Sequence, residues 1–308
     1  MRSLLCWPNC VAVRACIIFN PTARGDKARH FRKHLAEFAG GVALKPTQAP
    51  GDGRRLAAEA VRDGFDTLVA AGGDGTVNEV LNGIADAPDG FARTRLAVLP
   101  LGTVNVLARE LGLPLRLRAA WQVILNGNER RIDAPFADYT DPAGVRRRYF
   151  VQMAGAGLDA RAISLVDWEA KKRFSQFAYV LAGLKAMREP QPPITVEADG
   201  QTVTGELVLV GNGRFYGGSL PVFPDAKLDD GLLDLCVFPR VHWGLIARYA
   251  FGFVTGRPLV PRGVKVLRAT RACLRAASVP FEVDGDLCGM LPVELGVLPS
   301  VLRVVAPG

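Results

Sequence analysis

The sequence predicts two domains: an α/β domain built on a parallel sheet, then a mostly antiparallel β-sandwich domain. Up to about residue 126, short β-branched apolar runs alternate with segments whose apolar residues recur at helical spacing, as expected for parallel strands joined by crossover helices. After that point strand-like runs follow one another directly, which favours an antiparallel sandwich. We therefore expect a tail at 1–12, the α/β domain at 13–130 and the β-rich domain at 131–297.

Composition narrows the class of protein. The 308 residues are 49% hydrophobic and 22% charged, which is typical of a globular protein. No apolar run approaches the ~18–20 residues that a membrane-spanning helix requires. Six cysteines include no Cys-x-x-Cys, so we expect reduced thiols in a cytoplasmic protein. The net charge of +8 suits an anionic partner, either lipid headgroups or nucleic acid. The sequence shows no interleaving of aromatic and basic residues, so we predict no nucleic-acid partner.

The segment Asp66–Glu79, DTLVAAGGDGTVNE, is the most informative in the α/β domain. Asp66–Ala71 is typical of a buried strand, the next four residues have little side-chain bulk, and Thr76 opens a helical pattern. Free backbone N–H groups at a helix start, beside glycines that let a ligand approach, form a site for phosphate oxygens. Asp74 would require a cation or a hydroxyl donor there. From the residues alone, an ordinary strand-to-helix turn is the alternative.

The other predicted strands of this domain also end in polar or small residues. Val13–Asn20, Val42–Thr47 and Arg95–Pro100 have strand patterns, and parallel strands present their carboxyl ends at one edge, where open α/β folds bind ligands. Helical patterns follow at Arg54–Arg62 and Asn105–Leu111. His30 and His34 are one helical turn apart but have no third candidate ligand, which favours a solvated helix face.

The β-rich domain is expected to contain several strands and two helical insertions. The strands are Arg146–Met153, Ile194–Ala198, Thr202–Val210 and Leu232–Phe238, and the helices lie near Trp168–Met187 and His242–Val254.

Three segments of this domain carry polar groups suited to chemistry. In Gly155–Ala160, GAGLDA, Asp159 either caps a helix or contacts substrate. The segment Lys227–Leu232 is typical of a turn before a strand. If Phe281–Asp286, FEVDGD, is extended, its three carboxylates share one face and need a cation, a shared proton or exposure. The alternative is an Asp-Gly hairpin turn.

The string GGDGTVNE at Gly72–Glu79 resembles the diacylglycerol kinase and sphingosine kinase catalytic-domain family, whose bacterial members are soluble lipid kinases. Further motifs follow in the family's order from about Ala15 to Val305, including Asn20-Pro21-Thr22, the Thr47 loop and Pro100–Asn105. The resemblance implies a fold like that of NAD kinase and diacylglycerol kinase, with residues 298–308 returning to the first domain and with ATP and Mg²⁺ as cofactors. The implied nucleotide-binding residues are Asn20, Pro21, Thr22, Thr47, Gly72, Gly73, Asp74, Gly75, Thr76, Asn78, Glu79, Gly102, Thr103 and Asp286.

The resemblance also assigns roles to acidic residues. It implies that Asp284 is the catalytic base on the acceptor hydroxyl and that Asp74 acts on the metal–triphosphate side. It further implies a structural Mg²⁺ held by the Lys227 carbonyl, the Asp230 carboxylate and the Leu232 carbonyl, an oxygen set that suits a hard cation. The chain departs from the family's pattern where Arg24 replaces glycine, Val106 replaces aspartate and Asp286 replaces glutamate.

The expected function is that of an ATP-dependent lipid kinase that transfers the γ-phosphoryl group to the hydroxyl of a lipid such as diacylglycerol or a sphingoid base. It would belong to lipid metabolism and phospholipid biosynthesis. One alternative is a soluble-metabolite kinase like the NAD kinases, although their Thr-Gly-Ser-Thr-Ala signature is absent. The other alternative, suggested by Val106 and Asp286, is a non-catalytic lipid-binding relative.

An enzyme of this kind must reach lipid in a bilayer. We expect a cytoplasmic protein that contacts anionic membrane surfaces peripherally through its positive charge. The aromatic and basic side chains of Val241–Val254 suit such an interface. The alternative interpretation is that the aromatic side chains pack in the core of the second domain. Pairing of strand edges in the second domain would form a homodimer.

Overall fold

The computed structural model describes residues 14–21, 26–34, 40–165, 186, 191–245, 247–248, 251 and 263–308. It divides into two compact units: unit 1 comprises Met1–Ala134 and Pro299–Gly308, and unit 2 comprises Pro135–Leu298. Strands β5 (Asn128–Asp141) and β18 (Val293–Ala306) contribute residues to both units. The tail at 1–12, Thr22 and the helix expected near Trp168–Met187, apart from Ala186, lie outside the described residues.

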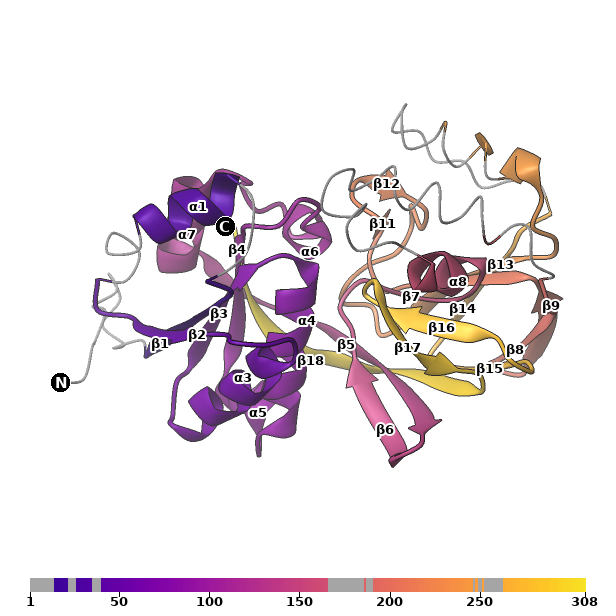
Figure 1. Cartoon of the computed structure of the whole chain (residues 1–308), viewed down its shortest axis with the longest axis horizontal. Helices are drawn as coiled ribbons and strands as arrows, with labels where there is room; N and C mark the ends of the chain where they lie inside the picture. The colour runs from indigo at the N-terminus through magenta and orange to yellow at the C-terminus, as the bar shows by residue number, and fades with distance from the viewer. Residues whose placement is uncertain are drawn as a thin grey trace. The chain divides into compact units, whose positions relative to one another are not determined.

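Unit 1 is built on a sheet of strand order β2-β1-β3-β4-β18 (Figure 1). All neighbouring pairs are parallel, including β18 with β4, where Arg303 faces Arg95. The strands that precede the boundary are β1 (Ala15–Phe19), β2 (Ala43–Pro46), β3 (Thr67–Gly72) and β4 (Arg95–Pro100).

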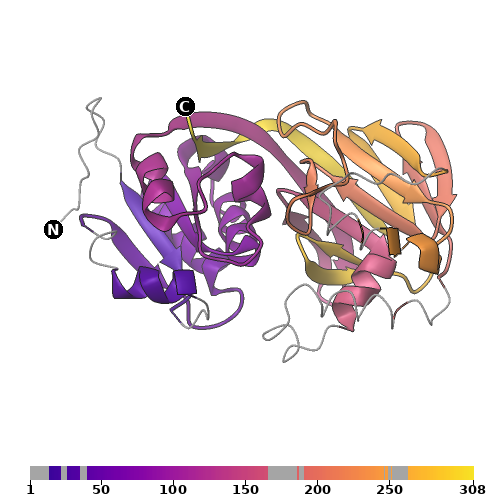
Figure 2. The same ribbon diagram turned by 90° about the horizontal axis from the view of Figure 1, so that it is seen from above.

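Helices cover both faces of this sheet, as Figures 1 and 2 show. Phe31 of α1 and Trp121 of α7 pack with Ile17 and Val69 on one face, and α3 and α4 pack together on the other. Because both faces are covered, β1 and β3 are buried along their whole length, which explains their continuous apolar sequence. The helices are α1 (Asp26–Lys33), α3 (Asp52–Arg62), α4 (Asp74–Asp86), α5 (Gly90–Arg93), α6 (Val106–Glu110) and α7 (Leu117–Asn126).

Unit 2 is a sandwich of two antiparallel sheets. One has the order β14-β13-β10-β7-β16-β17, and the other contains β9-β8-β15-β18 and the hairpin β5–β6. Side chains of both sheets, among them Val208 and Phe281 from the first and Val196 and Leu274 from the second, meet in one buried core, as in aligned β-sandwiches. The predicted fold class of an α/β unit followed by a β-sandwich is confirmed.

The elements of unit 2 are short. Its helix α8 spans Leu158–Ser164. Its remaining strands are β6 (Gly144–Tyr149), β7 (Met153–Gly157), β8 (Ile194–Ala198), β9 (Gln201–Gly205), β10 (Leu207–Gly211), β11 (Phe215–Tyr216), β12 (Leu220–Pro221), β13 (Leu233–Phe238), β14 (Lys265–Ala269), β15 (Arg271–Arg275), β16 (Pro280–Val283) and β17 (Asp286–Met290).

Two strands predicted as continuous are each interrupted. The run Thr202–Val210 forms β9 and β10, because at the junction the Glu206 amide donates to the Phe238 carbonyl (2.8 Å). The run Arg146–Met153 forms β6 and the first residue of β7, and the backbone between these strands donates hydrogen bonds to a distant carboxylate described below. Both breaks are imposed by partners far along the chain, so local alternation did not indicate them.

The segment with interfacial composition is only partly described. Trp243 and Phe251 have 56% and 60% of their surface exposed, so these two aromatics do not pack in the core as the alternative predicted. Tyr249 and Phe253 lie outside the described residues. Among the helices that the structure describes, none is both long and apolar enough to span a membrane.

Candidate active site

The carboxyl ends of β1 to β4 lie at one edge of the unit 1 sheet, because these strands are parallel. The loops there are joined by backbone hydrogen bonds. The Thr47 amide donates to the Phe19 carbonyl (2.9 Å), and the amides of Leu101 and Gly102 donate to the Gly72 carbonyl (2.9 and 3.2 Å). The predicted nucleotide loops after β1, β2, β3 and β4 are therefore brought to the same edge.

Glycines allow two of these loops to touch. A Cβ on Gly102 would lie 2.5 Å from the Cα of Gly73, so a larger residue would force the β3–α4 and β4–α6 loops apart. A Cβ on Gly75, by contrast, would meet no atom within 4 Å. Gly73 also precedes α4 without a side-chain cap, and uncapped amides at the start of a long helix are donors suited to phosphate.

Helix α4 begins at Asp74, not at Thr76 as the sequence predicted. The Val77 amide donates to the Gly73 carbonyl (3.1 Å), and this first helical hydrogen bond makes Asp74 the first residue of α4. The Asp74 carboxylate accepts hydrogen bonds from the backbone amides of Val106 (2.7 Å) and Asn105 (3.0 Å). Burial raises the pKa of Asp74, and these amide bonds oppose the rise. The carboxylate thus ties the start of α4 to the start of α6. Val106, where the family's pattern has aspartate, supplies an amide donor and buries its side chain.

Asn78 and Glu79 also contact protein groups. The two Glu79 carboxylate oxygens accept from the amides of Gly51 (2.9 Å) and Gly53 (2.8 Å), which anchors the loop between β2 and α3. The Asn78 side chain is buried, and its oxygen accepts from the Asn82 side chain (3.2 Å). These contacts make Glu79 a residue that holds the Thr47 loop in place.

In unit 2, the predicted base lies on a tight turn. Strand β16 ends at Val283 and β17 begins at Asp286, while Asp284 and Gly285 have φ angles of 49° and 86°. Two successive left-handed residues are the signature of an Asp-Gly hairpin turn. The prediction of an extended segment with three carboxylates on one face is therefore wrong, and the alternative prediction of a hairpin turn is confirmed.

Backbone amides hold the Asp284 carboxylate. It accepts from Val151 (3.0 Å), Gln152 (3.1 Å) and Met153 (3.2 Å), and the Asp284 amide donates to the Met153 carbonyl (2.9 Å). The three donors lie at the break between β6 and β7. Hydrogen bonds from amides to an ionised carboxylate are stronger than those between neutral groups, so this half-buried side chain is firmly oriented.

Asp286 has a different environment from Asp284. It is exposed and forms an ion pair with Arg148 (2.7 Å), a type of contact that contributes little to stability at a surface. The turn separates the two carboxylates, which an extended strand would have placed together.

Sequence reasoning gave no separate role to Glu282, which belongs to a buried acidic pair. Glu282 is fully buried in β16, and its Oε2 accepts from the Gly285 amide (2.7 Å). Asp159, on α8, accepts a hydrogen bond from the Tyr216 hydroxyl. Burial raises the pKa of both carboxyl groups. The sequence signal that could have indicated this pair is a glutamate within the otherwise apolar run of β16.

Asp159 is not a helix cap, as one interpretation of the sequence proposed. Helix α8 begins one residue earlier, at Leu158, and its N-cap position is Gly157 without a side-chain hydrogen bond. Asp159 instead turns toward Tyr216 because the hydroxyl of that residue offers a donor.

The predicted Mg²⁺ ligand Asp230 lies in a small acidic cluster. Its carboxylate accepts from the Leu232 amide (3.1 Å) and pairs with Arg268, which also contacts Asp234 (3.2 Å). Asp234 Oδ2 is buried and lacks a hydrogen-bond partner in the described part of the chain. Burial raises the pKa of Asp234, and Arg268 lowers it. The unsatisfied Asp234 Oδ2 lies in the same cluster as the Asp230 carboxylate, and oxygen ligands of this kind fit a hard cation. Arg268 would compete with that cation for both carboxylates.

Nothing comparable indicates a metal elsewhere. Across the described residues, no group of three His, Cys, Asp or Glu side chains could hold an ion. His30 and His34 stack with ring centroids 4.1 Å apart on the surface of unit 1, as the solvated-face interpretation predicted. The four described cysteines are free thiols.

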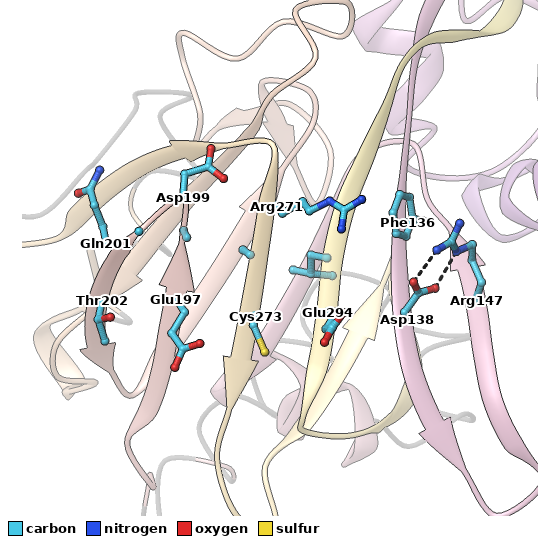
Figure 3. Close-up of a pocket in the computed structure, with 14 residues that line it drawn as sticks. Phe136, Asp138, Arg147, Glu197, Asp199, Gln201, Thr202, Arg271, Cys273 and Glu294 are labelled. Carbon is cyan, nitrogen blue, oxygen red and sulfur yellow. Dashed lines mark hydrogen bonds and ion pairs between the residues drawn. The ribbon is translucent and has the colours of Figure 1, made fainter.

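A cavity of about 420 Å³ lies in unit 2 over strands β8, β9 and β15 and the adjoining β5 and β18 (Figure 3). Its lining combines charged side chains with apolar ones. Arg147 donates twice to Asp138 (2.7 and 2.6 Å) and lies 3.9 Å from the centre of the Phe136 ring. The lining includes none of the predicted site residues, so the cavity is separate from the Asp284 turn.

Fold and site together combine an α/β unit whose glycine loops gather at a sheet edge with a β-sandwich that presents a carboxylate on a turn. Solved structures of kinases share this fold. The structure of yeast NADH kinase complexed with NADH has the same fold, with a TM-score of 0.52, 13% identity and coverage of 99% of this chain and 89% of that chain.

The family is shown by closer comparisons. Residues 14–136 match the diacylglycerol kinase catalytic domain, and residues 152–306 match the YegS C-terminal NAD kinase beta sandwich-like domain. A diacylglycerol kinase of Bacillus subtilis (strain 168) is 33% identical over 96% of both chains, and one of Staphylococcus aureus (strain MRSA252) is 30% identical over 96% of this chain and 92% of its own. This chain therefore belongs to the diacylglycerol kinase family, and it is a kinase.

A solved structure agrees with this assignment. The structure assigned as a diacylglycerol kinase from Bacillus anthracis str. Sterne matches with a TM-score of 0.72 and 25% identity, covering 95% of this chain and 96% of that chain. The match extends across both units, so the shared architecture is not limited to the α/β part.

Proposed function

We propose that this kinase transfers the γ-phosphoryl group of ATP to the hydroxyl of a lipid such as diacylglycerol or a sphingoid base, as a step of phospholipid metabolism. The observation that carries the proposal is the Asp284 carboxylate, which three backbone amides orient on a half-exposed turn. A fixed carboxylate at the surface is suited to accept a proton from a hydroxyl that binds beside it. The names of the family relatives support diacylglycerol as the acceptor.

Unit 1 supports the donor side of the proposal. ATP enters as its Mg²⁺ complex, and the uncapped start of α4 and the open side of Gly75 offer backbone donors to its phosphates. Asp74 and Glu79 hold the loops around them. Asp74 already accepts two amide hydrogen bonds, so we assign it the positioning of the β4–α6 loop and not a contact with the metal.

The chemical step follows from these assignments. The lipid hydroxyl oxygen forms a bond to the γ-phosphorus, the bond from that phosphorus to the β–γ bridging oxygen breaks, and ADP leaves. Asp284 takes the hydroxyl proton. Because phosphoryl transfer depends mainly on positioning and on stabilising charge, oriented amides and one oriented carboxylate match what the reaction requires.

Access to a bilayer lipid belongs to the same proposal. We place the protein in the cytoplasm, in peripheral contact with anionic membranes, on the strength of its net charge of +8 and its exposed Trp243 and Phe251. Next to the Asp284 turn, Leu287 and Met290 of β17 are 45% and 56% exposed, which suits contact with an acyl chain. A homodimer formed through strand edges of unit 2 completes the proposal.

An acceptor panel tests the function. We expect MgATP-dependent phosphorylation of diacylglycerol or a sphingoid base in anionic vesicles and none of NAD. Vesicle binding should rise with the anionic lipid fraction and weaken between about 0.05 and 0.5 M salt, because screening shortens the range of attraction. Phosphorylation of NAD would establish the metabolite-kinase alternative. Binding of lipid without turnover of any acceptor would establish a non-catalytic relative.

The cation site has its own test. Asp230→Ala should remove bound Mg²⁺, measured by elemental analysis, and lower the melting temperature by about 2–4 °C for each kcal/mol lost. A chelator should lower the melting temperature of the wild type but not that of the variant. Asp229→Ala, one residue away, is the matched control and should keep the metal. If the chelator leaves the melting temperature of the wild type unchanged, Lys227–Leu232 is only a turn.

A further inference from the structure

The buried acidic pair contains two oxygen atoms that lack partners. Asp159 Oδ2 and Glu282 Oε1 are both buried, and neither has a hydrogen-bond partner within the described ranges. They lie beside the same glycine, since a Cβ on Gly155 would be 2.5 Å from Asp159 Oδ2 and 3.0 Å from Glu282 Oε1. The missing side chain of Gly155 thus makes room for two carboxyl groups that approach each other.

One proton between these atoms would satisfy both of them. Two ionised carboxylates do not share a buried site, because neither charge is solvated and the two repel. The other oxygen of each group already accepts a hydrogen bond, Asp159 from Tyr216 and Glu282 from Gly285. A hydrogen on Glu282 Oε1 that is donated to Asp159 Oδ2 completes the network and leaves one negative charge.

We propose that Asp159 and Glu282 share one proton, held on Glu282, and that this pair positions the turn carrying Asp284. The inference rests on the proposed role of Asp284 as the base. Glu282 accepts a hydrogen bond (2.7 Å) from the amide of Gly285, the residue that follows Asp284. The turn is therefore held from one side by this pair and from the other by the amides of residues 151–153.

The surroundings keep Glu282 neutral. Burial is the main cause that raises the pKa of Glu282, and the charges of Asp159 and Asp284 raise this pKa further. The hydrogen bond from the Gly285 amide lowers it. Cys288 also faces Glu282, and burial raises the pKa of this thiol to about 11. The Tyr216 hydroxyl faces the pair from the side of Asp159. Arg148, a cation on β6, is paired with Asp286.

The shared proton makes the turn sensitive to pH. Because the pKa of Glu282 is higher in the folded protein than its ordinary value, its contribution to stability is complete below that ordinary value, about 4.3. This contribution falls as pH rises and is lost once pH passes the folded-state pKa. Above that point two negative charges face each other beside Gly155, and the Asp284 turn loses its support.

The decisive comparison is between Glu282→Gln and Glu282→Ala. Glutamine keeps an acceptor for Gly285 and donates a permanent N–H to Asp159, so it replaces the protonated glutamate. We expect kcat within about threefold of wild type near pH 7, an alkaline limb of the kcat profile moved to higher pH, and a melting temperature that falls less steeply with pH. Alanine leaves both partners unsatisfied, so kcat should drop at least about tenfold together with stability.

Controls separate this inference from the proposed function. Glu197→Gln, an exposed pair partner of Arg275 in the other sheet, should leave the pH dependence of melting unchanged. If Glu282→Gln loses as much kcat as Glu282→Ala and its melting temperature follows the wild-type pH dependence, the shared proton is wrong. The melting measurement needs no turnover, so it stands even if Asp284 proves not to be the base.

Discussion

Asp284→Asn is expected to lower kcat for lipid phosphorylation about 10²–10⁴-fold, the range for loss of a general base. Asparagine keeps one oxygen for the amides of residues 151–153 but presents an NH₂ group to the remaining donor, so the orientation of the turn also suffers. The predicted nucleotide loops that follow β1 to β4 belong to unit 1, so we expect KM for ATP to change little. Steady-state kinetics with lipid in anionic vesicles measure both constants.

A neighbouring substitution provides the control for that experiment. Asp286→Asn removes an exposed carboxylate that is paired with Arg148, and its predicted nucleotide contact should make KM for ATP change more than kcat. Asp284→Asn with kcat within a few-fold of wild type would remove the base from the mechanism, whatever the result at Asp286.

Asp74→Ala is expected to reduce turnover at least about 100-fold, the scale on which small misplacements affect a reacting group. The Asp74 carboxylate holds the amides of Asn105 and Val106, so its loss frees the β4–α6 loop against which Gly73 packs. The same two hydrogen bonds cap the start of α6, so stability should fall by about 0.5–2 kcal/mol. ATP turnover and thermal melting measure the two effects.

The other end of the same helix offers a matched control. Asp86→Ala removes the ion pair with Arg54 (2.6 Å) at the C-terminal end of α4, and it should change stability slightly without affecting turnover. Activity of Asp74→Ala close to the wild-type level would contradict the role assigned to the central loop.

The sequence alone determined the alternating strands and helices of unit 1 up to β4, because the signals involved are local. Apolar periodicity changes within a few residues where a strand gives way to a helix, and Gly72 and Gly73 mark the turn from β3 into α4. The Gly72–Glu79 string also identified the family, because a motif of this length depends on no tertiary contact. The same kind of local signal predicted β8 with its observed bounds. It also indicated the Asp-Gly turn at Asp284, as the alternative to an extended segment.

Only the tertiary structure decided what surrounds the acidic residues. The amides that hold Asp284 are 131 to 133 residues away along the chain, and Asp159 reaches the buried pair from a different element than Glu282. The break between β6 and β7 has the same origin, since its amides turn toward Asp284. Burial and hydrogen-bond partners determine the charge and the orientation of a carboxylate, and both are set by segments that the chain brings together only when it folds.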